Sequence, residues 1–335
     1  MQTSRTHWLE RHWYRITPLH AILLPISLIF LLLTFARRAL YAVGILRSEA
    51  LPVPVIVVGN ITVGGTGKTP LTLWLAQQLI AAGRRPGIIS RGFGGDNVAP
   101  RAVGSHDDAE AVGDEPLLMA RRALCPVWIG RDRAAAGRAL LAAHPECDII
   151  ISDDGLQHYR LRRDAEIIVV DGKRRFGNGF PLPAGPLREL PSRLKRAAAV
   201  VVNGGKITPG TYQMQLEGAT FYNLRDPALR RSADDFRNMT LHAVAGIGNP
   251  RRFFDQLAVF GLRALCHPFP DHYRYTPADL AFADADAILM TEKDAVKCAP
   301  FADEKCWALR VDAHIDPALI PLILKKVAPH GSQAA

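Results

Sequence analysis

The chain has 335 residues, enough for one large domain or two ordinary ones, and 48% of them are hydrophobic. Its formal net charge of +9 at pH 7 suits nucleic acid, an anionic membrane surface or a phosphorylated substrate. Five scattered cysteines without a CxxC pair argue against a zinc site or a disulfide framework and favour a reducing compartment. The low aromatic content and the lack of a recognition motif argue against nucleic acid as a partner.

An apolar run near the N-terminus, LHAILLPISLIFLLLTFA at residues 19–36, contains no Asp, Glu, Lys or Arg. Arginines precede and follow it, and its length is at the lower limit for crossing a bilayer. His20, Pro25 and Ser27 weaken it as a plain spanning helix. We therefore predict that residues 1–45 form a membrane-associating helical segment, embedded in one leaflet of a lipid surface.

Two alternatives exist for this apolar run. A buried core helix has a similar composition, although Trp8, Trp13 and Tyr14 at the expected interface favour the membrane. A cleaved signal peptide fits less well, because no small-residue cleavage site follows and Arg37 and Arg38 come directly after the run.

Short apolar runs alternate with helical stretches after this segment. Strands are predicted at residues 53–59, 86–90, 126–130, 147–152, 165–170 and 197–203. Helices are predicted at residues 69–83, 113–124 and 131–144. This alternation predicts an α/β fold with a mainly parallel sheet and helices on both faces, over residues 46–205.

The pattern changes after residue 205. Residues 212–224 alternate between apolar and polar, as exposed antiparallel strands do, and we predict a linker ribbon at 206–228. A second strand–helix series follows, with strands at 241–248, 264–269, 286–291 and 306–312 and a helix at 249–261. It predicts a smaller C-terminal α/β domain over 229–335, ending in a frayed tail.

A glycine-rich loop joins the first predicted strand to the first predicted helix, which is the context that a phosphate-binding loop requires. Its sequence TVGGTGKT departs from the template GxxxxGK[ST] only at Thr62, where a glycine is usual. Lys68 can reach the β- and γ-phosphates of a nucleotide, and Thr69 can offer its hydroxyl to Mg²⁺. The predicted nucleotide-binding residues are Thr62, Val63, Gly64, Gly65, Thr66, Gly67, Lys68 and Thr69.

Two adjacent carboxylates, Asp153 and Asp154, directly follow the strand predicted at 147–152. In a parallel sheet the carboxyl ends of the strands share one edge, so both should lie near the glycine-rich loop. Carboxylates bind Mg²⁺ directly or through its water molecules. A solvated turn is the alternative for this pair taken alone.

A kinase also needs a group that takes the proton of the acceptor hydroxyl. Asp114 and Glu115 stand at the start of a predicted helix, and His272 lies in a proline-bounded loop beside Asp271. A carboxylate oriented by a histidine is a recurring form of general base. Taken singly, these residues also fit ordinary helix-terminal and loop positions.

Seven motifs together resemble the tetraacyldisaccharide 4′-kinase family, the lipid A 4′-kinases. In chain order they are VGNITVGGTGKTP, SRGFGG, VGDEPLL, DDGLQH, GNGFPLPAGPLREL, FPDHYRYT and TEKDAVK. The family's own loop also lacks the first glycine of the general template. The resemblance implies transfer of a phosphate from ATP, with Mg²⁺, to the 4′-hydroxyl of a tetraacylated glucosamine disaccharide 1-phosphate. It also implies the cytoplasmic face of a Gram-negative inner membrane.

The resemblance implies roles for individual residues. Asp114 resembles the family's catalytic base and His272 its partner, while Lys68 is the catalytic lysine of the loop. Metal-binding positions match Thr69, Asp153, Asp154 and, with less support, Glu115. The remaining matches are Glu189 near the nucleotide base, and Arg91, Gln157 and Lys293 as substrate-binding or phosphate-neutralising residues.

A membrane-associated ATPase switch of the partitioning type is the alternative function, because its loop is also similar to GGTGKT. Those ATPases carry a further lysine just before the glycine pair, where this chain has Val63. A phosphate-binding scaffold without turnover is disfavoured by the intact Lys68 and Thr69 together with Asp153 and Asp154. No obligate protein partner is predicted; the expected partners are the lipid A precursor and the lipid surface.

Overall fold

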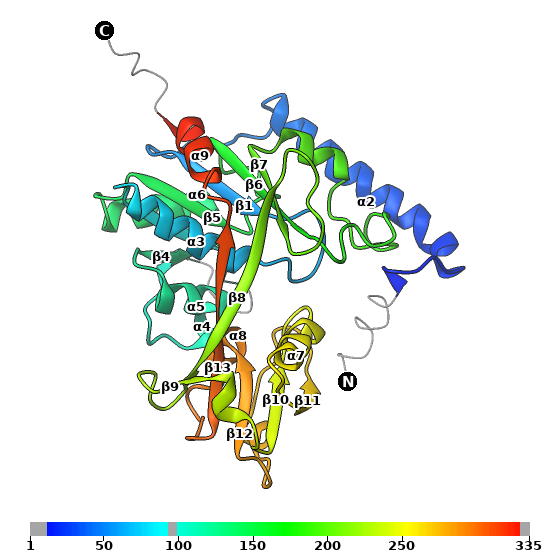
Figure 1. Ribbon diagram of the computed structural model, residues 1–335. Helices are drawn as coiled ribbons and strands as arrows, with labels where there is room; N and C mark the ends of the chain where they lie inside the picture. Colours follow the sequence, from blue (N-terminus) through cyan, green and yellow to red (C-terminus); the bar gives the residue numbers. More distant parts are fainter. Residues whose placement is uncertain (1–11, 93–98, 329–335) are drawn as a thin grey trace.

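A computed structural model describes residues 12–92 and 99–328 as one mixed sheet flanked by helices (Figure 1). Trp8, the last three residues of the SRGFGG motif and the expected C-terminal tail lie outside the described residues. The strand order is β11-β10-β12-β13-β8-β7-β6-β1-β5-β2-β4-β3, with β9 paired to β8. The sheet therefore continues from the N-terminal part of the chain into the C-terminal part.

The N-terminal part contains the parallel strands that the sequence predicts. Its strands are β1 (Val55–Gly59), β2 (Pro86–Ser90), β4 (Val127–Ile129), β5 (Ile149–Asp153), β6 (Ala165–Asp171) and β7 (Ala199–Asn203), with β3 (Arg101–Ala102) antiparallel at the edge. Its helical elements are α3 (Lys68–Ala81), α4 (Ala109–Val112), α5 (Asp114–Arg122), α6 (Arg133–Ala143), η1 (Pro191–Arg196) and, from the end of the chain, α9 (Leu319–Val327). All five residues of β1 are buried, as expected for a strand covered on both faces.

Helices cover both faces of this parallel sheet. Ile56 and Val58 of β1 pack in the same core cluster as Leu71 of α3, whereas Val57 packs with Leu140 of α6. Because successive side chains of a strand point to opposite faces, the two clusters lie on opposite sides of the sheet. This arrangement fixes the carboxyl ends of the strands, where the glycine-rich loop begins.

The predicted linker ribbon contains one long strand, which pairs with a second long strand near the end of the chain. β8 (Tyr212–Asn223) pairs in parallel with β7 at one end and antiparallel with β13 (Cys306–Ile315) along its length. Figure 1 shows both strands running from one part of the molecule into the other. The sequence predicted the antiparallel character of β8 but ended β13 at residue 312. The division at residues 205 and 228 stays a prediction, because the sheet is continuous across both positions.

The C-terminal part is a smaller, mainly parallel α/β layer. Its elements are β9 (Arg230–Ser232), η2 (Ala233–Phe236), β10 (Leu241–Ala245), α7 (Pro250–Val259), β11 (Ala264–Pro268), η3 (Pro277–Leu280), β12 (Ala287–Thr291) and α8 (Glu292–Cys298). α8 packs near α5 of the N-terminal part, and α7 begins beside the glycine-rich loop. These two helices therefore bring C-terminal residues to the edge where β1 and β5 end.

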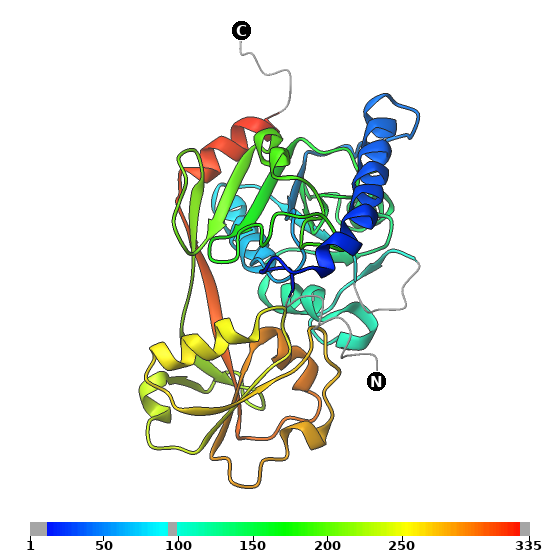
Figure 2. The same cartoon turned by 90° about the vertical axis from the view of Figure 1, so that its right-hand side faces the viewer.

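The N-terminal apolar run forms α2 (Leu19–Ala42), which lies along the outside of the N-terminal part (Figure 2). Among the described residues it is the single helix that is long and apolar enough to cross a membrane. Its side chains Leu32, Leu33 and Phe35 are more than half exposed, so α2 is not the buried core helix of the alternative interpretation.

Polar residues of α2 attach the helix to the loop at 178–184. Ser27 Oγ donates to the carbonyl of Pro181 at 3.0 Å and accepts from the amide of Ala184 at 3.0 Å. The His20 ring lies 2.9 Å from the side-chain amide of Asn178. Two of the three residues that weakened α2 as a spanning helix, His20 and Ser27, are thus its buried polar contacts with the rest of the protein.

Candidate active site

The glycine-rich loop joins β1 to α3 in a conformation that requires glycine. Gly64 and Gly67 have φ values of 101° and 96°, a region that other residues rarely adopt. A Cβ on Gly67 would lie 2.4 Å from Asn203 Nδ2, which donates to the carbonyl of Thr66 at 2.8 Å. Asn60 Nδ2 donates to the hydroxyl of Thr66 at 3.2 Å. Asn203 of β7 and Asn60, which follows β1, thus hold the loop in this conformation.

A cavity of about 570 Å³ opens between this loop and the C-terminal part. Its lining includes most of the site residues predicted from the sequence: Val63, Gly64, Gly65, Thr66, Gly67, Lys68, Thr69, Arg91, Asp114, Glu115, Asp153, Asp154, His272 and Lys293. Thr62, Gln157 and Glu189 are not part of the described lining. The volume is within the usual range for a small-molecule site.

The two carboxylates after β5 lie beside the loop, because Asp153 pairs with Val58 in the parallel register. Thr72 Oγ1 donates to Asp153 Oδ1 at 2.9 Å, while Asp153 Oδ2 has no hydrogen-bond partner among the described residues. The pKa of Asp153 is raised to about 7. Burial is the largest cause and the negative charge of Glu115 the second, while the positive charge of Lys68 opposes them. A buried carboxylate oxygen without a partner is a group that a cation can satisfy.

Asp154 lies close to two basic side chains that also line the cavity. Its Oδ1 lies 3.6 Å from Lys68 Nζ and 3.5 Å from a guanidinium nitrogen of Arg188. Burial would raise the pKa of Asp154, but Lys68 and Arg188 outweigh it and lower the value. Asp154 is therefore ionised at neutral pH, next to the lysine that the loop presents.

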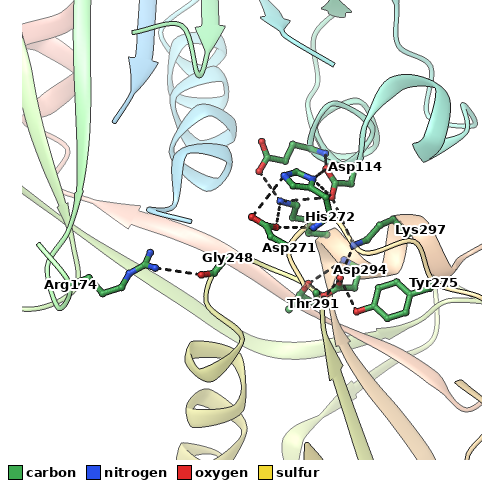
Figure 3. Close-up of polar contacts among 12 residues, drawn as sticks. Asp114, Arg174, Gly248, Asp271, His272, Tyr275, Thr291, Asp294 and Lys297 are labelled. Carbon is green, nitrogen blue, oxygen red and sulfur yellow. Dashed lines mark hydrogen bonds and ion pairs between the residues drawn. The ribbon is translucent and has the colours of Figure 1, made fainter. Parts of the chain in front are cut away.

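Asp114 and His272 both line the cavity and contact each other (Figure 3). Asp114 is the first residue of α5 and is 5% exposed, and its two carboxylate oxygens lie 3.1 and 3.0 Å from His272 Nδ1. Burial would raise the pKa of Asp114, but Lys293, His272 and Lys297 together lower it to about 2. Although burial opposes the change, the hydrogen bond with Asp114 raises the pKa of His272.

Lys293 is surrounded by carboxylates. Its Nζ lies 3.0 Å from Glu115 Oε1, 3.1 Å from Asp271 Oδ1 and 3.8 Å from Asp114 Oδ2. Burial would lower the pKa of Lys293, but these three acidic groups raise it, Glu115 first. Glu115, predicted to bind a metal, is thus paired with this lysine in the structure.

Gln157 and Glu189 form a polar cluster behind the loop. Gln157 Nε2 donates to Glu189 Oε1 at 2.9 Å and to the carbonyl of Asn60 at 3.1 Å. Tyr159 donates to the other oxygen of Glu189 at 3.0 Å, and Arg193 forms an ion pair with it at 3.3 Å. Gln157, in the segment after β5, is thus hydrogen-bonded both to Asn60, which follows β1, and to Glu189, which precedes η1.

The sequence interpretation missed several residues that line the cavity or hold its walls. Arg188 stands next to Glu189 in the GNGFPLPAGPLREL motif, so that motif could have indicated it. Arg252 of α7 lines the cavity and donates to Asn203 Oδ1 at 3.0 Å, but no sequence signal singles it out. Arg174 donates to the carbonyl of Gly248 (Figure 3). It also donates to the carbonyl of Gly65 and so connects the loop to the C-terminal part.

Comparison with known proteins places this chain in a family. The family model for tetraacyldisaccharide-1-P 4′-kinase matches residues 19–328. A tetraacyldisaccharide 4′-kinase of Methylobacillus flagellatus is 50% identical over 327 residues, covering 98% of each chain. One from Azoarcus sp. is 51% identical over 341 residues, covering 100% of this chain and 98% of its own.

A solved structure supports the same relationship. The "apo" form of LpxK from Aquifex aeolicus in complex with ATP has a TM-score of 0.78 and 30% identity, covering 92% of this chain and 99% of its own. This match confirms the predicted P-loop NTPase-type α/β fold with an N-terminal apolar helix. The family match over nearly the whole chain does not favour the partitioning-type switch. The chain belongs to the tetraacyldisaccharide 4′-kinase family and is a kinase.

Proposed function

We propose that this kinase transfers the γ-phosphate of ATP to the 4′-hydroxyl of a tetraacylated glucosamine disaccharide 1-phosphate, a precursor of lipid A. One observation carries the proposal: a single cavity is lined both by the phosphate-binding loop and by the Asp114–His272 pair. A kinase needs both, since it must hold the donor phosphate and position an acceptor hydroxyl in line with it. The relatives' names supply the identity of the acceptor.

The loop is the site for the triphosphate. Backbone N–H groups from Gly64 to Lys68, at the N-terminus of α3, form a cradle for anionic oxygens. The Lys68 side chain is mostly buried and forms an ion pair with Asp154. In this position its ammonium group can contact the β- and γ-phosphates. The relative solved in complex with ATP supports ATP as the donor.

Mg²⁺ fits the residues beside the loop. Within residues 12–92 and 99–328, no group of three or more His, Cys, Asp or Glu side chains is arranged to hold a metal by itself. Mg²⁺ usually takes one or two protein oxygens, with phosphate and water oxygens completing its shell. Thr69, Asp154 and the unpartnered oxygen of Asp153 would provide those protein oxygens. When bound, the ion neutralises charge on the phosphates.

Asp114 acts on the acceptor hydroxyl. In the transfer, a bond forms between the hydroxyl oxygen and the γ-phosphorus, the bond from that phosphorus to the β–γ bridging oxygen breaks, and the hydroxyl proton passes to the Asp114 carboxylate. A pKa of about 2 keeps Asp114 ionised and makes it a weak base. Because phosphoryl transfer has a loose transition state, the proton can leave late, and the carboxylate mainly orients the hydroxyl.

His272 fixes the carboxylate for that task. Its Nδ1–H donates to Asp114, and its raised pKa favours the imidazolium form, whose charge balances the ionised carboxylate of the buried Asp114. The backbone amide of Glu115 also donates to Asp114 Oδ1, at 2.8 Å. These two donors leave the carboxylate fewer orientations, which favours in-line geometry.

Helix α2 would keep the enzyme at the surface where its lipid substrate resides. Its exposed apolar side chains suit the hydrocarbon of one leaflet, and the basic charge of the chain suits anionic headgroups and a substrate that already carries a phosphate. The contacts of His20 and Ser27 with the loop at 178–184 favour a helix lying against the protein over one that crosses the bilayer alone. We place the kinase at the cytoplasmic face of the inner membrane, where ATP is available.

The test uses ATP labelled in its γ-phosphate, magnesium and the tetraacylated disaccharide 1-phosphate in mixed micelles. Label should move to the lipid, and a lipid whose 4′-hydroxyl is blocked should accept none. Release of label only as inorganic phosphate, at the same rate with and without lipid, would contradict the proposal and favour an ATPase.

A further inference from the structure

Lys297 lies beside Asp114, among the charged residues at the start of α5 and on α8 (Figure 3). It is on α8, one helical turn after Lys293, and its Nζ lies 3.9 Å from Asp114 Oδ2. The same Nζ lies 3.0 Å from Asp294 Oδ1 and 5.0 Å from the centre of the Tyr275 ring. Its side chain is 10% exposed and is not part of the described cavity lining. Lys297 is therefore placed to act on Asp114 and not on a substrate.

Asp294 holds Lys297 in this place. The carboxylate of Asp294 is 0% exposed and accepts hydrogen bonds from the amide of Gly246 at 3.1 Å, Tyr275 Oη at 3.2 Å and Thr291 Oγ1 at 2.7 Å. These donors come from the end of β10, the loop after β11 and the end of β12. A buried carboxylate with fixed donors on several elements has little freedom, so it fixes the ammonium group that pairs with it.

A connected chain of charges thus runs from the interior of the C-terminal part to the cavity. Asp294 binds Lys297, Lys297 faces Asp114, and Asp114 binds His272 at the cavity wall. Lys293 also faces Asp114, at 3.8 Å, but it forms its shorter contacts with Glu115 and Asp271. Lys297 differs from Lys293 because its other partner is buried and its position does not depend on groups that line the cavity.

We propose that Lys297, fixed by Asp294, is a positioning residue that holds the Asp114 carboxylate in the orientation needed to receive the acceptor hydroxyl. The proposal rests on the role of Asp114 in the proposed function. Without the cation beside it, the buried carboxylate would turn toward Lys293 or the cavity water, and the acceptor would lose its in-line alignment. A misplacement of about 1 Å can cost a reaction about a hundredfold in rate.

The first experiment replaces Lys297 by Met, which keeps an unbranched apolar chain and removes the charge. We expect kcat with the lipid precursor to fall about 10- to 100-fold, with KM for ATP unchanged because Lys297 lies away from the glycine-rich loop. Lys297→Arg should recover part of the loss. Lys326→Met, at an exposed position of α9, is the matched control and should change neither constant.

The second experiment repeats Lys297→Met in an Asp114→Asn background, with thermal unfolding and ATP binding checked for each variant. If Lys297 acts through Asp114, the added substitution should cause no further loss of kcat. Equal losses in both backgrounds, or no loss in the wild-type background, would overturn the proposal. An unimpaired Asp114→Asn would overturn the role of Asp114 itself, which distinguishes that failure from a failure of Lys297 alone.

Tyr275→Phe provides a second variant should Lys297→Met fail to fold. It removes one donor to Asp294 and leaves the ring under Lys297 in place. Its smaller loss of kcat should also vanish in the Asp114→Asn background. The same loss in both backgrounds would overturn the proposal.

Discussion

His272 Nδ1 lies 3.0 Å from Asp114 Oδ2, although 158 residues separate the two in the chain. Asp114 begins α5 in the N-terminal part, and His272 follows β11 in the C-terminal part. Two further cations of the C-terminal part, Lys293 and Lys297, lie within 4 Å of the same carboxylate. The electrostatic environment of Asp114 is thus built by a part of the chain that does not contain it.

Lys68 should be essential for turnover. Its ammonium group would stabilise the charge that develops on the transferring phosphate, and one such contact is worth a hundredfold or more in kcat, roughly 3 kcal/mol. Lys68→Ala should therefore lose most of kcat, and Lys326→Ala, at an exposed position, should lose none. Steady-state kinetics with saturating lipid would measure both. Near-wild-type turnover of Lys68→Ala would remove the loop from the mechanism.

The His272–Asp114 pair should make stability depend on pH. The pKa of His272 is raised above its ordinary value of 6.5, so the stabilisation is fully present below that pH and is lost as pH rises through the folded-state value. His272→Gln cannot carry the charge. The difference in Tm between wild type and this variant should be largest near pH 6 and should shrink toward pH 9. A difference that grows with pH would contradict an imidazolium at this position.

The exposed face of α2 should control membrane attachment. Replacing Leu32, Leu33 and Phe35 by Ser removes apolar surface but leaves the contacts of His20 and Ser27 with the loop intact. Sedimentation with anionic vesicles in high salt should fall strongly, with ATP binding unchanged, because the apolar term of binding scales with buried area.

Leu124→Ser is the control for this experiment, since Leu124 is an exposed apolar side chain 80% accessible and outside α2. It should sediment as wild type does. Complete sedimentation of the triple variant in high salt would show that another surface attaches the protein to the membrane.

The sequence predicts well what depends on local order along the chain. Gly64, Gly67 and Lys68 stand between a strand and a helix, and only a few loop conformations connect the two. The rule that parallel strands end at one edge places Asp153 beside the loop, and the register of β1 with β5 agrees with it.

What the sequence could not predict depends on contacts between distant segments. The spacing of Asp114 and His272 carries no information about their distance; only the resemblance to a family linked them. Arg252 and Lys297 look like ordinary basic residues of short helices, because their partners Asn203 and Asp294 are brought to them only by the fold. Glu189 was expected near the nucleotide base, and its burial among Gln157 and Tyr159 could not be inferred from its motif.

The most direct test of the account is the kcat of Asp114→Asn, His272→Ala and the double variant with ATP and the lipid precursor. Asp114→Asn keeps the size of the side chain and removes its charge, so kcat should fall by about a hundredfold to ten-thousandfold with little change in ATP affinity. His272→Ala should lose less, and the double variant should be little worse than Asp114→Asn, because residues that act as one unit are not additive. Multiplicative losses would show two separate roles, and an unimpaired Asp114→Asn would contradict the account.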